Sequence, residues 1–207
     1  MGWLAAGAVI VFILYRVLLS RARRQALQAF QFPRSIKSKV QNKYQHLNDS
    51  QLEMVMTGLK EYFALCQLGG RRMVAMPSQA VDVAWHEFIL FTRAYEQFCQ
   101  KCFGRFLHHT PAEAMQSPTQ AQSGIKTAWR LACHKEGIDR RNPNRLPMIF
   151  SMDHDLQIPD GFVYSLNCKG PGGVGYCASH IGCGSGCAGG GDSDGGDGGC
   201  GGGCGGD

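Results

Sequence analysis

Residues 78–104 decide the fold of this chain: Ser-Gln-Ala-Val-Asp-Val-Ala-Trp-His-Glu-Phe-Ile-Leu-Phe-Thr-Arg-Ala-Tyr-Glu-Gln-Phe-Cys-Gln-Lys-Cys-Phe-Gly. Apolar side chains recur at intervals of three or four residues, which is the spacing of one face of an amphipathic helix. Ser78 is suited to cap the start of this helix, and Gly104 to end it. The positions expected to face inward are Val81, Ala84, Trp85, Phe88, Ile89, Thr92, Tyr95, Phe98, Cys99 and Cys102. The stretch is long for one helix, and we expect a break near Thr92.

Two further stretches have the same periodicity. One begins near Ser50, where Ser50 and Glu53 have the spacing of a capping box, and ends at Gly69-Gly70. The other covers residues 119–134 and ends at Gly137. Because three helical segments account for most of this region, we expect a small, mainly α domain.

Residues 138–167 have a different character. Asn142-Pro143 and Leu146-Pro147 interrupt helices. We predict short strands or packed extended segments at 148–152 and 162–166. The helical domain is therefore expected to span residues 50–167.

Residues 1–24 predict a transmembrane anchor with a basic flank. From Trp3 to Leu19 the chain is apolar except at Arg16, over 17 residues, close to the shortest helix that crosses ~30 Å of hydrocarbon. The long side chain of Arg16 can reach the lipid headgroups. A cleaved signal peptide has its charges before the apolar run, whereas here they follow it. A buried helix of a soluble protein is the alternative.

The charges after the apolar run predict the orientation of the anchor. Eight basic residues precede the first acidic residue, Asp49: Arg16, Arg21, Arg23, Arg24, Arg34, Lys37, Lys39 and Lys43. Because positive flanks stay on the cytoplasmic side, we expect the N-terminus outside and the C-terminal body in the cytoplasm. Residues 25–49 are expected to form a basic juxtamembrane linker, and the eight charges to lie against anionic lipid headgroups.

Composition limits the function classes. The chain has 207 residues and a formal net charge of +5. About 140 residues lie between the anchor and the Gly-rich end, enough for one domain with a single core. The eight juxtamembrane charges exceed the whole net charge, so nucleic acid is not an expected partner. In a reducing cytosol, ten cysteines indicate thiols or metal ligands rather than disulfides.

A set of polar and aromatic residues within 77–111 resembles the helical core of the glycine-rich domain-containing protein family. That family shares a Val-Asp-x-x-Trp-His element, then a Tyr-x-x-Phe-Cys-like element, then one or two histidines. The matching positions are Val81, Asp82, Trp85, His86, Tyr95, Phe98, Cys99, His108 and His109. The resemblance covers roughly residues 50–135 and implies a helical fold, without an agreed biochemical activity.

The same segment contains a candidate metal site. Asp82 and His86 are four residues apart and share one helical face. If the loop after Gly104 returns over that face, His108 and His109 complete a set of three or four N/O ligands for zinc or another transition metal. The alternative is that Asp82 and His86 form a hydrogen-bonded brace without a metal. Leu90 takes the place of the second histidine of a His-Glu-x-x-His motif, so a zinc protease of that class is excluded.

Residues 168–207 form a Gly/Cys-rich tail that we expect to be disordered unless a ligand organises it. Two C-x3-C pairs, Cys183 with Cys187 and Cys200 with Cys204, could close a tetrahedral metal site. The alternative is a flexible, repeat-prone tail whose cysteines have no such role.

The remaining cysteines favour a structural role. Cys99-Gln-Lys-Cys102 is a C-x-x-C pair, but it does not follow a strand in a βαβ unit as a redox motif does. We expect Cys99 and Cys102, like Cys66 and Cys133, to be buried thiols.

Two functions remain as candidates for this chain. One is a membrane-anchored helical module, without catalysis, that binds a metal or a protein partner through its tail. The other is a membrane-bound metal-dependent enzyme or redox protein that uses the Asp/His cluster.

Overall fold

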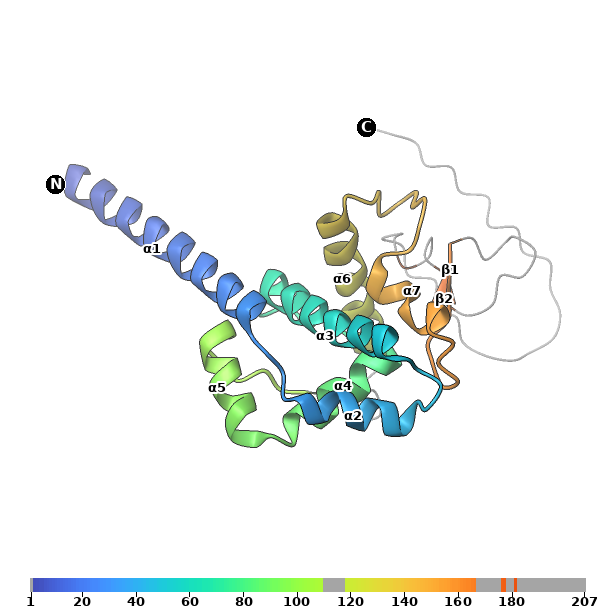
Figure 1. Ribbon diagram of the computed structural model, residues 1–207. Helices are drawn as coiled ribbons and strands as arrows, with labels where there is room; N and C mark the ends of the chain where they lie inside the picture. The colour runs from blue at the N-terminus through green and yellow to red at the C-terminus, as the bar shows by residue number, and fades with distance from the viewer. Residues whose placement is uncertain (1, 110–117, 167–175, 178–180, 182–207) are drawn as a thin grey trace, which may run out of the picture.

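The computed structural model describes the chain except at residues 1, 110–117, 167–175, 178–180 and 182–207 (Figure 1). Over the described residues the protein is mainly helical, as expected from its periodicity. The helices are α1 (Gly2–Ala29), α2 (Arg34–Lys43), α3 (Asp49–Gly69), α4 (Gln79–Ile89), α5 (Thr92–Phe103), α6 (Pro118–Glu136) and α7 (Met148–Asp155). Two short parallel strands, β1 (Tyr164–Ser165) and β2 (Tyr176–Cys177), pair Tyr164 with Tyr176.

α3 is the central element of the domain. It packs against α1, α2, α4, α6 and α7. Phe63, which is fully buried, lies within an aromatic cluster, with its ring centroid 4.8 Å from that of Phe98 and 5.8 Å from that of Trp85. Because this cluster draws its rings from α3, α4 and α5, burial of aromatic surface holds these three helices together.

α3 begins two residues earlier than expected. The capping box is formed by Asn48 and Gln51 rather than by Ser50 and Glu53. The side chain of Asn48 accepts from the Gln51 backbone amide, and the side chain of Gln51 accepts from that of Asn48, each over 2.9 Å. Both pairs have the required spacing, and the asparagine satisfies the first free amides of the helix.

The expected break near Thr92 is confirmed. α4 ends at Ile89 and α5 begins at Thr92, with Leu90 and Phe91 forming the corner between the two helices. α6 matches the third predicted helix, with one or two more residues at each end. Gly137 follows α6 with a φ of 66°, a left-handed conformation that glycine adopts without strain.

The strand predicted at 148–152 is wrong, because this segment is helical. α7 begins after Pro147, whose fixed φ suits a helix start. The side chains of Ile149, Phe150 and Met152 are buried, and packing against α3 and α4 favours the helix over an extended segment. The segment 162–166 does contain a strand, β1.

α1 has two parts with different surroundings. Its outer part projects from the domain (Figure 1), and side chains from Val9 to Leu18 are largely exposed although they are apolar. Its inner end is part of the core, where Leu27 is fully buried. Within the described residues, Ala5–Ala29 is the helix long and apolar enough for a membrane span or a signal sequence, and its most apolar stretch is not buried.

Residues 25–49, expected as a linker, are folded into the domain. They contain the last residues of α1 and all of α2, which packs against α3 and α4. Ile36 and Val40 of α2 are fully buried. Their spacing of four residues gives this basic helix a narrow apolar face, which the surrounding charges obscure in the sequence. The tail predicted at 168–207 lies outside the described residues, except for β2 and Ile181.

A buried carboxylate fixes the start of α4. Asp153 of α7 is 2% exposed and accepts four hydrogen bonds. Three come from the first residues of α4 and its cap: Ser78 Oγ at 2.6 Å, the Gln79 amide at 2.6 Å and the Ala80 amide at 3.2 Å. The fourth comes from the Phe162 amide at 2.9 Å. The negative charge also lies at the positive end of the α4 dipole, so Asp153 joins α4, α7 and the chain before β1.

Asp153→Ala is expected to lower the free energy of unfolding by about 3 kcal/mol, because it leaves four donors without a buried, charged acceptor. Asp153→Asn should cost less, since an amide oxygen still accepts. The measurement is urea unfolding of the full chain in detergent, followed by tryptophan fluorescence. Asp155→Ala is the control, because that exposed side chain makes only a 3.5 Å contact with His154. An equal decrease in the free energy of unfolding for Asp153→Ala and Asp155→Ala would contradict the role of Asp153 in fixing the start of α4.

Candidate metal centre

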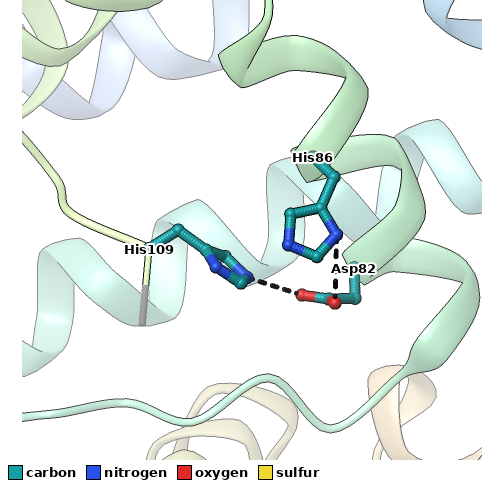
Figure 2. A group of neighbouring side chains, drawn as sticks. All are labelled: Asp82, His86 and His109. Carbon is teal, nitrogen blue, oxygen red and sulfur yellow. Dashed lines mark hydrogen bonds and ion pairs between the residues drawn. The ribbon is translucent and has the colours of Figure 1, made fainter. Parts of the chain in front are cut away.

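Three side chains with metal-ligating atoms meet where the loop after α5 crosses α4 (Figure 2). Asp82 and His86 lie one turn apart on α4, and His109 comes from the loop. His109 Nε2 lies 2.9 Å from Asp82 Oδ1, and His86 Nδ1 lies 3.4 Å from Asp82 Oδ2. One ligand atom from each residue can be chosen so that all three atoms lie within 4.8 Å of one another. The carboxylate therefore uses one oxygen for each imidazole.

A chain of two hydrogen bonds holds the loop in place over α4. Gly104 ends α5 in a left-handed conformation, with φ at 68°, and turns the chain back. Trp85 Nε1 donates to Tyr95 Oη over 3.1 Å, and Tyr95 Oη donates to the Leu107 carbonyl over 2.5 Å. Burial raises the pKa of Tyr95 well above its usual range, so the hydroxyl keeps its proton. The loop is thereby fixed two residues before His109.

Trp85 also touches the site directly. Its ring meets that of His109 edge to face, with the centroids 4.3 Å apart. Trp85 is buried, so it forms an apolar wall beneath the imidazole. The ring of His109 is thus positioned by Trp85 on one side and by Asp82 on the other, and His86 lies 4.2 Å from it, centroid to centroid.

The site is closed on the protein side and open toward solvent. The side chain of His109 is 10% exposed and that of Asp82 is 19% exposed, whereas that of His86 is 50% exposed. A metal ion held by these residues would keep open positions for water or another ligand, as catalytic zinc sites and two-histidine, one-carboxylate sites do.

The distances between the three side chains can be compared with those around a small divalent ion. Zinc binds nitrogen and oxygen at roughly 2.0–2.1 Å, which separates two ligands by about 2.9 Å at octahedral angles and about 3.4 Å at tetrahedral angles. The separations of 2.9 and 3.4 Å are measured to different oxygens of Asp82, and a set with one atom from each of the three residues lies within 4.8 Å. The same distances also suit hydrogen bonds from imidazole to carboxylate. As it stands, the geometry is that of the brace considered from the sequence, and a metal ion bound by one atom from each residue would draw the three side chains closer together.

His108, the fourth candidate ligand from the sequence, does not join the group. Its side chain is exposed, and its ring packs against that of Phe106, with the centroids 4.9 Å apart. Adjacent residues in an extended loop point in opposite directions, so only one of the two histidines can face α4. The structure selects His109.

The cysteines of the helical domain are inert. Cys66, Cys99, Cys102 and Cys133 are free and buried, as expected. Burial raises the pKa of Cys66 to about 12 and that of Cys102 to about 11. Such thiols stay protonated near neutral pH and are poor nucleophiles and ligands. The tail candidates, Cys183, Cys187, Cys200 and Cys204, lie outside the described residues.

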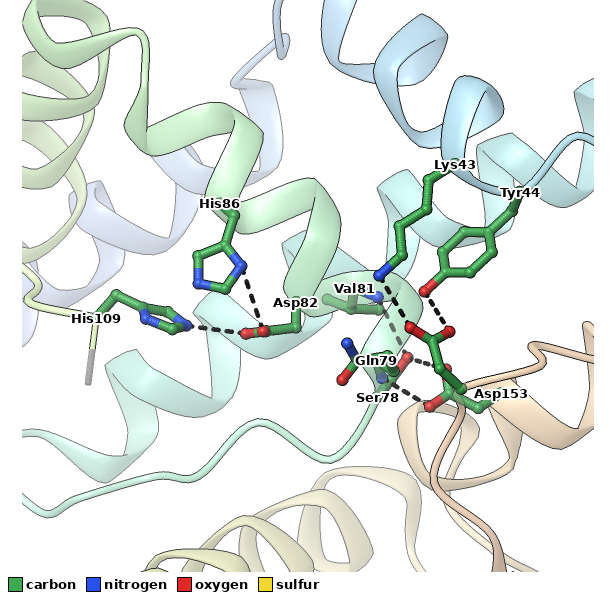
Figure 3. A network of polar contacts seen from close by, with 10 residues as sticks. Lys43, Tyr44, Ser78, Gln79, Val81, Asp82, His86, His109 and Asp153 are labelled. Atoms are coloured by element: carbon green, nitrogen blue, oxygen red, sulfur yellow. Dashed lines mark hydrogen bonds and ion pairs between the residues drawn. The ribbon is translucent and has the colours of Figure 1, made fainter. Parts of the chain in front are cut away.

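A second polar network supports the site from the other end of α4 (Figure 3). The Asp153 carboxylate holds Ser78 and Gln79 at the start of the helix. Beside it, Asp160 accepts from Tyr44 Oη over 2.8 Å and pairs with Lys43 Nζ over 2.9 Å. Sequence reasoning missed the roles of Asp153 and Asp160. No local pattern signals them, because their partners are 75 and 116 residues away in the chain.

Tyr95→Phe is expected to loosen the loop that carries His109 without substituting Asp82, His86 or His109 themselves. The change removes the donor to the Leu107 carbonyl and the acceptor for Trp85, which should lower the free energy of unfolding by about 1–2 kcal/mol. Hydrogen exchange should increase at residues 105–109 more than in α3. Uniform exchange across α3 and the loop would show that Tyr95 acts on the whole fold instead.

Comparison with known proteins identifies one family. The family model described as UCP032817-like matches residues 22–181, which is most of the chain, and the chain therefore belongs to that family. The match begins just after the apolar part of α1 and includes α2, in agreement with their place in the fold. No curated protein and no solved structure matches the chain. The resemblance to glycine-rich domain-containing proteins stays a prediction.

Proposed function

We propose that this member of the UCP032817-like family is a membrane-anchored helical module that binds a divalent transition-metal ion, such as zinc, through Asp82, His86 and His109. α1 crosses the membrane once, with its N-terminus outside and the helical domain on the cytoplasmic side. The observation that carries the metal-binding role is the meeting of one carboxylate and two imidazoles at a half-open surface site.

The surroundings of α1 support the anchor. Apolar side chains from Val9 to Leu18 have no protein surface to pack against, and their exposure to water would be unfavourable at roughly 25 cal/mol for each Å². A lipid bilayer removes this cost. Arg21, Arg23 and Arg24 follow the apolar stretch and favour the cytoplasmic side for the domain.

The arrangement of the ligands supports metal binding over a brace alone. A brace between Asp82 and His86 needs one imidazole, yet the fold brings a second one, from 27 residues along the chain, to the other oxygen of the same carboxylate. His109 in turn is held by Trp85 and the loop. Ligands that are positioned by surrounding contacts are typical of metal sites.

The other candidates use different residues. The tail cysteines could hold a metal or a protein partner, independently of the domain. A membrane-bound metal-dependent enzyme would use the open positions of the Asp82–His86–His109 site for its substrate. A redox role for Cys99 and Cys102 is the least supported, because both thiols are buried and burial raises the pKa of each.

Metal content distinguishes these candidates. The full chain, purified in detergent and loaded with zinc, should hold one equivalent that is lost on His86→Ala or His109→Ala. Each substitution should weaken zinc binding at least about 100-fold, since even groups outside the ligand set contribute 10–100-fold. Affinity should also fall as the pH is lowered, because protons compete with the metal for imidazole.

His108→Ala is the matched control, since it removes a neighbouring exposed histidine that makes no contact with Asp82. It should leave this zinc equivalent in place. Replacement of Cys183, Cys187, Cys200 and Cys204 by serine tests the tail separately. If zinc is lost when the tail cysteines are replaced but kept when His86 or His109 is replaced, the group in the helical domain is a brace. The tail cysteines are then the metal ligands.

The membrane topology can be measured in bacterial cells with reporters fused to the C-terminus. A green fluorescent protein fusion should fluoresce and an alkaline phosphatase fusion should be inactive, because the first folds in the cytoplasm and the second needs the oxidising side. The protein should resist extraction by alkaline carbonate. An active alkaline phosphatase fusion would show that the C-terminus lies outside the cytoplasm, opposite to the proposed orientation. Release of the protein by alkaline carbonate would exclude the membrane anchor.

A further inference from the structure

Basic side chains from three separate segments converge where α1 leaves the domain. We propose that they form a surface that binds anionic phospholipid headgroups, so that the domain is docked on the membrane as well as tethered to it. We call this surface the basic collar; its members are Arg21, Arg23, Arg24, Arg71, Arg72, Lys101 and Arg105. The inference rests on the proposed membrane anchor, but not on the metal site.

One side chain joins the three segments. Gln67 Nε2, near the end of α3, donates to the Arg23 carbonyl of α1 over 3.0 Å and to the Cys102 carbonyl of α5 over 2.8 Å. The ends of α3 and α5 therefore lie against the same turn of α1. Arg71 and Arg72 follow α3, and Lys101 lies in the last turn of α5, so these cations are brought beside those of α1.

Close packing at Gly104 confirms that α5 ends against α1. A Cβ at Gly104 would overlap the guanidinium of Arg23. The next residue, Arg105, donates to the Gly70 carbonyl over 2.7 Å and so joins the end of α5 to the end of α3. The segments that carry the collar, which lie far apart in the sequence, are thus joined by direct contacts.

The collar is drawn from stretches of sequence without acidic residues, and Glu96, just outside them, lines the same surface hollow as Lys101. Residues 16–48, 66–76 and 97–108, from which it is drawn, contain neither Asp nor Glu. Two of the basic residues on α2 are paired with carboxylates: Lys37 contacts Glu53 and Asp49, and Lys43 contacts Asp160. Arg21, Arg24, Arg71, Arg72 and Lys101 are exposed. The unbalanced charge is therefore available to an external anion.

The position of the collar favours a membrane over other anionic partners. Arg23 lies four residues beyond Leu19, the last residue of the apolar run, which is about 6 Å along the helix. The headgroup layer on each side of a bilayer is of this thickness or slightly more. α2, with Lys37, Lys39 and Lys43, lies well away from the exposed part of α1 (Figure 1). The structure therefore divides the eight basic residues noted in the sequence: Arg21, Arg23 and Arg24 of α1 join the collar, whereas Arg16, within the apolar run, and the four on α2 do not.

The test compares the full chain in nanodiscs of phosphatidylcholine with the full chain in nanodiscs that also contain phosphatidylserine. Binding of headgroups to the folded domain should raise the melting temperature by several degrees in the anionic discs, and 0.5 M salt should remove most of this difference. Arg71→Gln/Arg72→Gln/Lys101→Gln should reduce the difference by at least half. Each variant is its own reference, so a general loss of stability does not affect the result.

Lys39→Gln/Arg140→Gln/Arg141→Gln is the matched control, with two arginines and one lysine that are exposed and outside the collar. It should keep the lipid-dependent difference. Equal melting temperatures in the two kinds of nanodisc would contradict the proposed lipid binding by the collar. An equal decrease of the lipid-dependent difference in both triple variants would contradict it too. Neither result would bear on the membrane anchor or the metal site. Failure of the chain to enter nanodiscs would instead exclude the anchor, and the collar with it.

Discussion

The buried carboxylate of Asp153 is the contact on which the arrangement of the site helix depends. It accepts hydrogen bonds from Ser78, Gln79 and Ala80 at the start of α4, and α4 carries Asp82, Trp85 and His86. In a low-dielectric interior, a charge with four donors is strongly held, and any shift of α4 would break several bonds at once. Asp153 does not touch the Asp82–His86–His109 group, yet it fixes the start of the helix from which Asp82 and His86 project.

The proposed metal site combines a rigid helix with a loop that is fixed by its own contacts. Asp82 and His86 are aligned by helical geometry, whereas His109 reaches them because Tyr95 holds the Leu107 carbonyl and Trp85 packs against the imidazole. The helix keeps two ligands in register, and the half-exposed His86 leaves a side open to solvent.

α1 connects the domain to its surroundings without a flexible linker. The helix is unbroken from Gly2 to Ala29, and its inner end is held by Leu27 in the core and by Gln67 at the backbone of Arg23. A continuous helix transmits orientation as well as position, so a membrane that holds the outer part of α1 would also orient the domain. The basic collar would then face the lipid and leave the metal centre free of it, on α4.

The sequence by itself determined where several helical segments lie, because these follow from local periodicity, caps and glycines: the helix that ends at Gly69, the break near Thr92 and the apolar run of residues 3–19. It also placed Asp82 and His86 on one face. Only the tertiary structure decided that His109 rather than His108 joins them, that residues 148–152 are helical, and that residues 25–49 belong to the core. Each of these depends on contacts between residues far apart in the chain, such as those of Asp153 and Gln67, and local patterns do not specify such contacts.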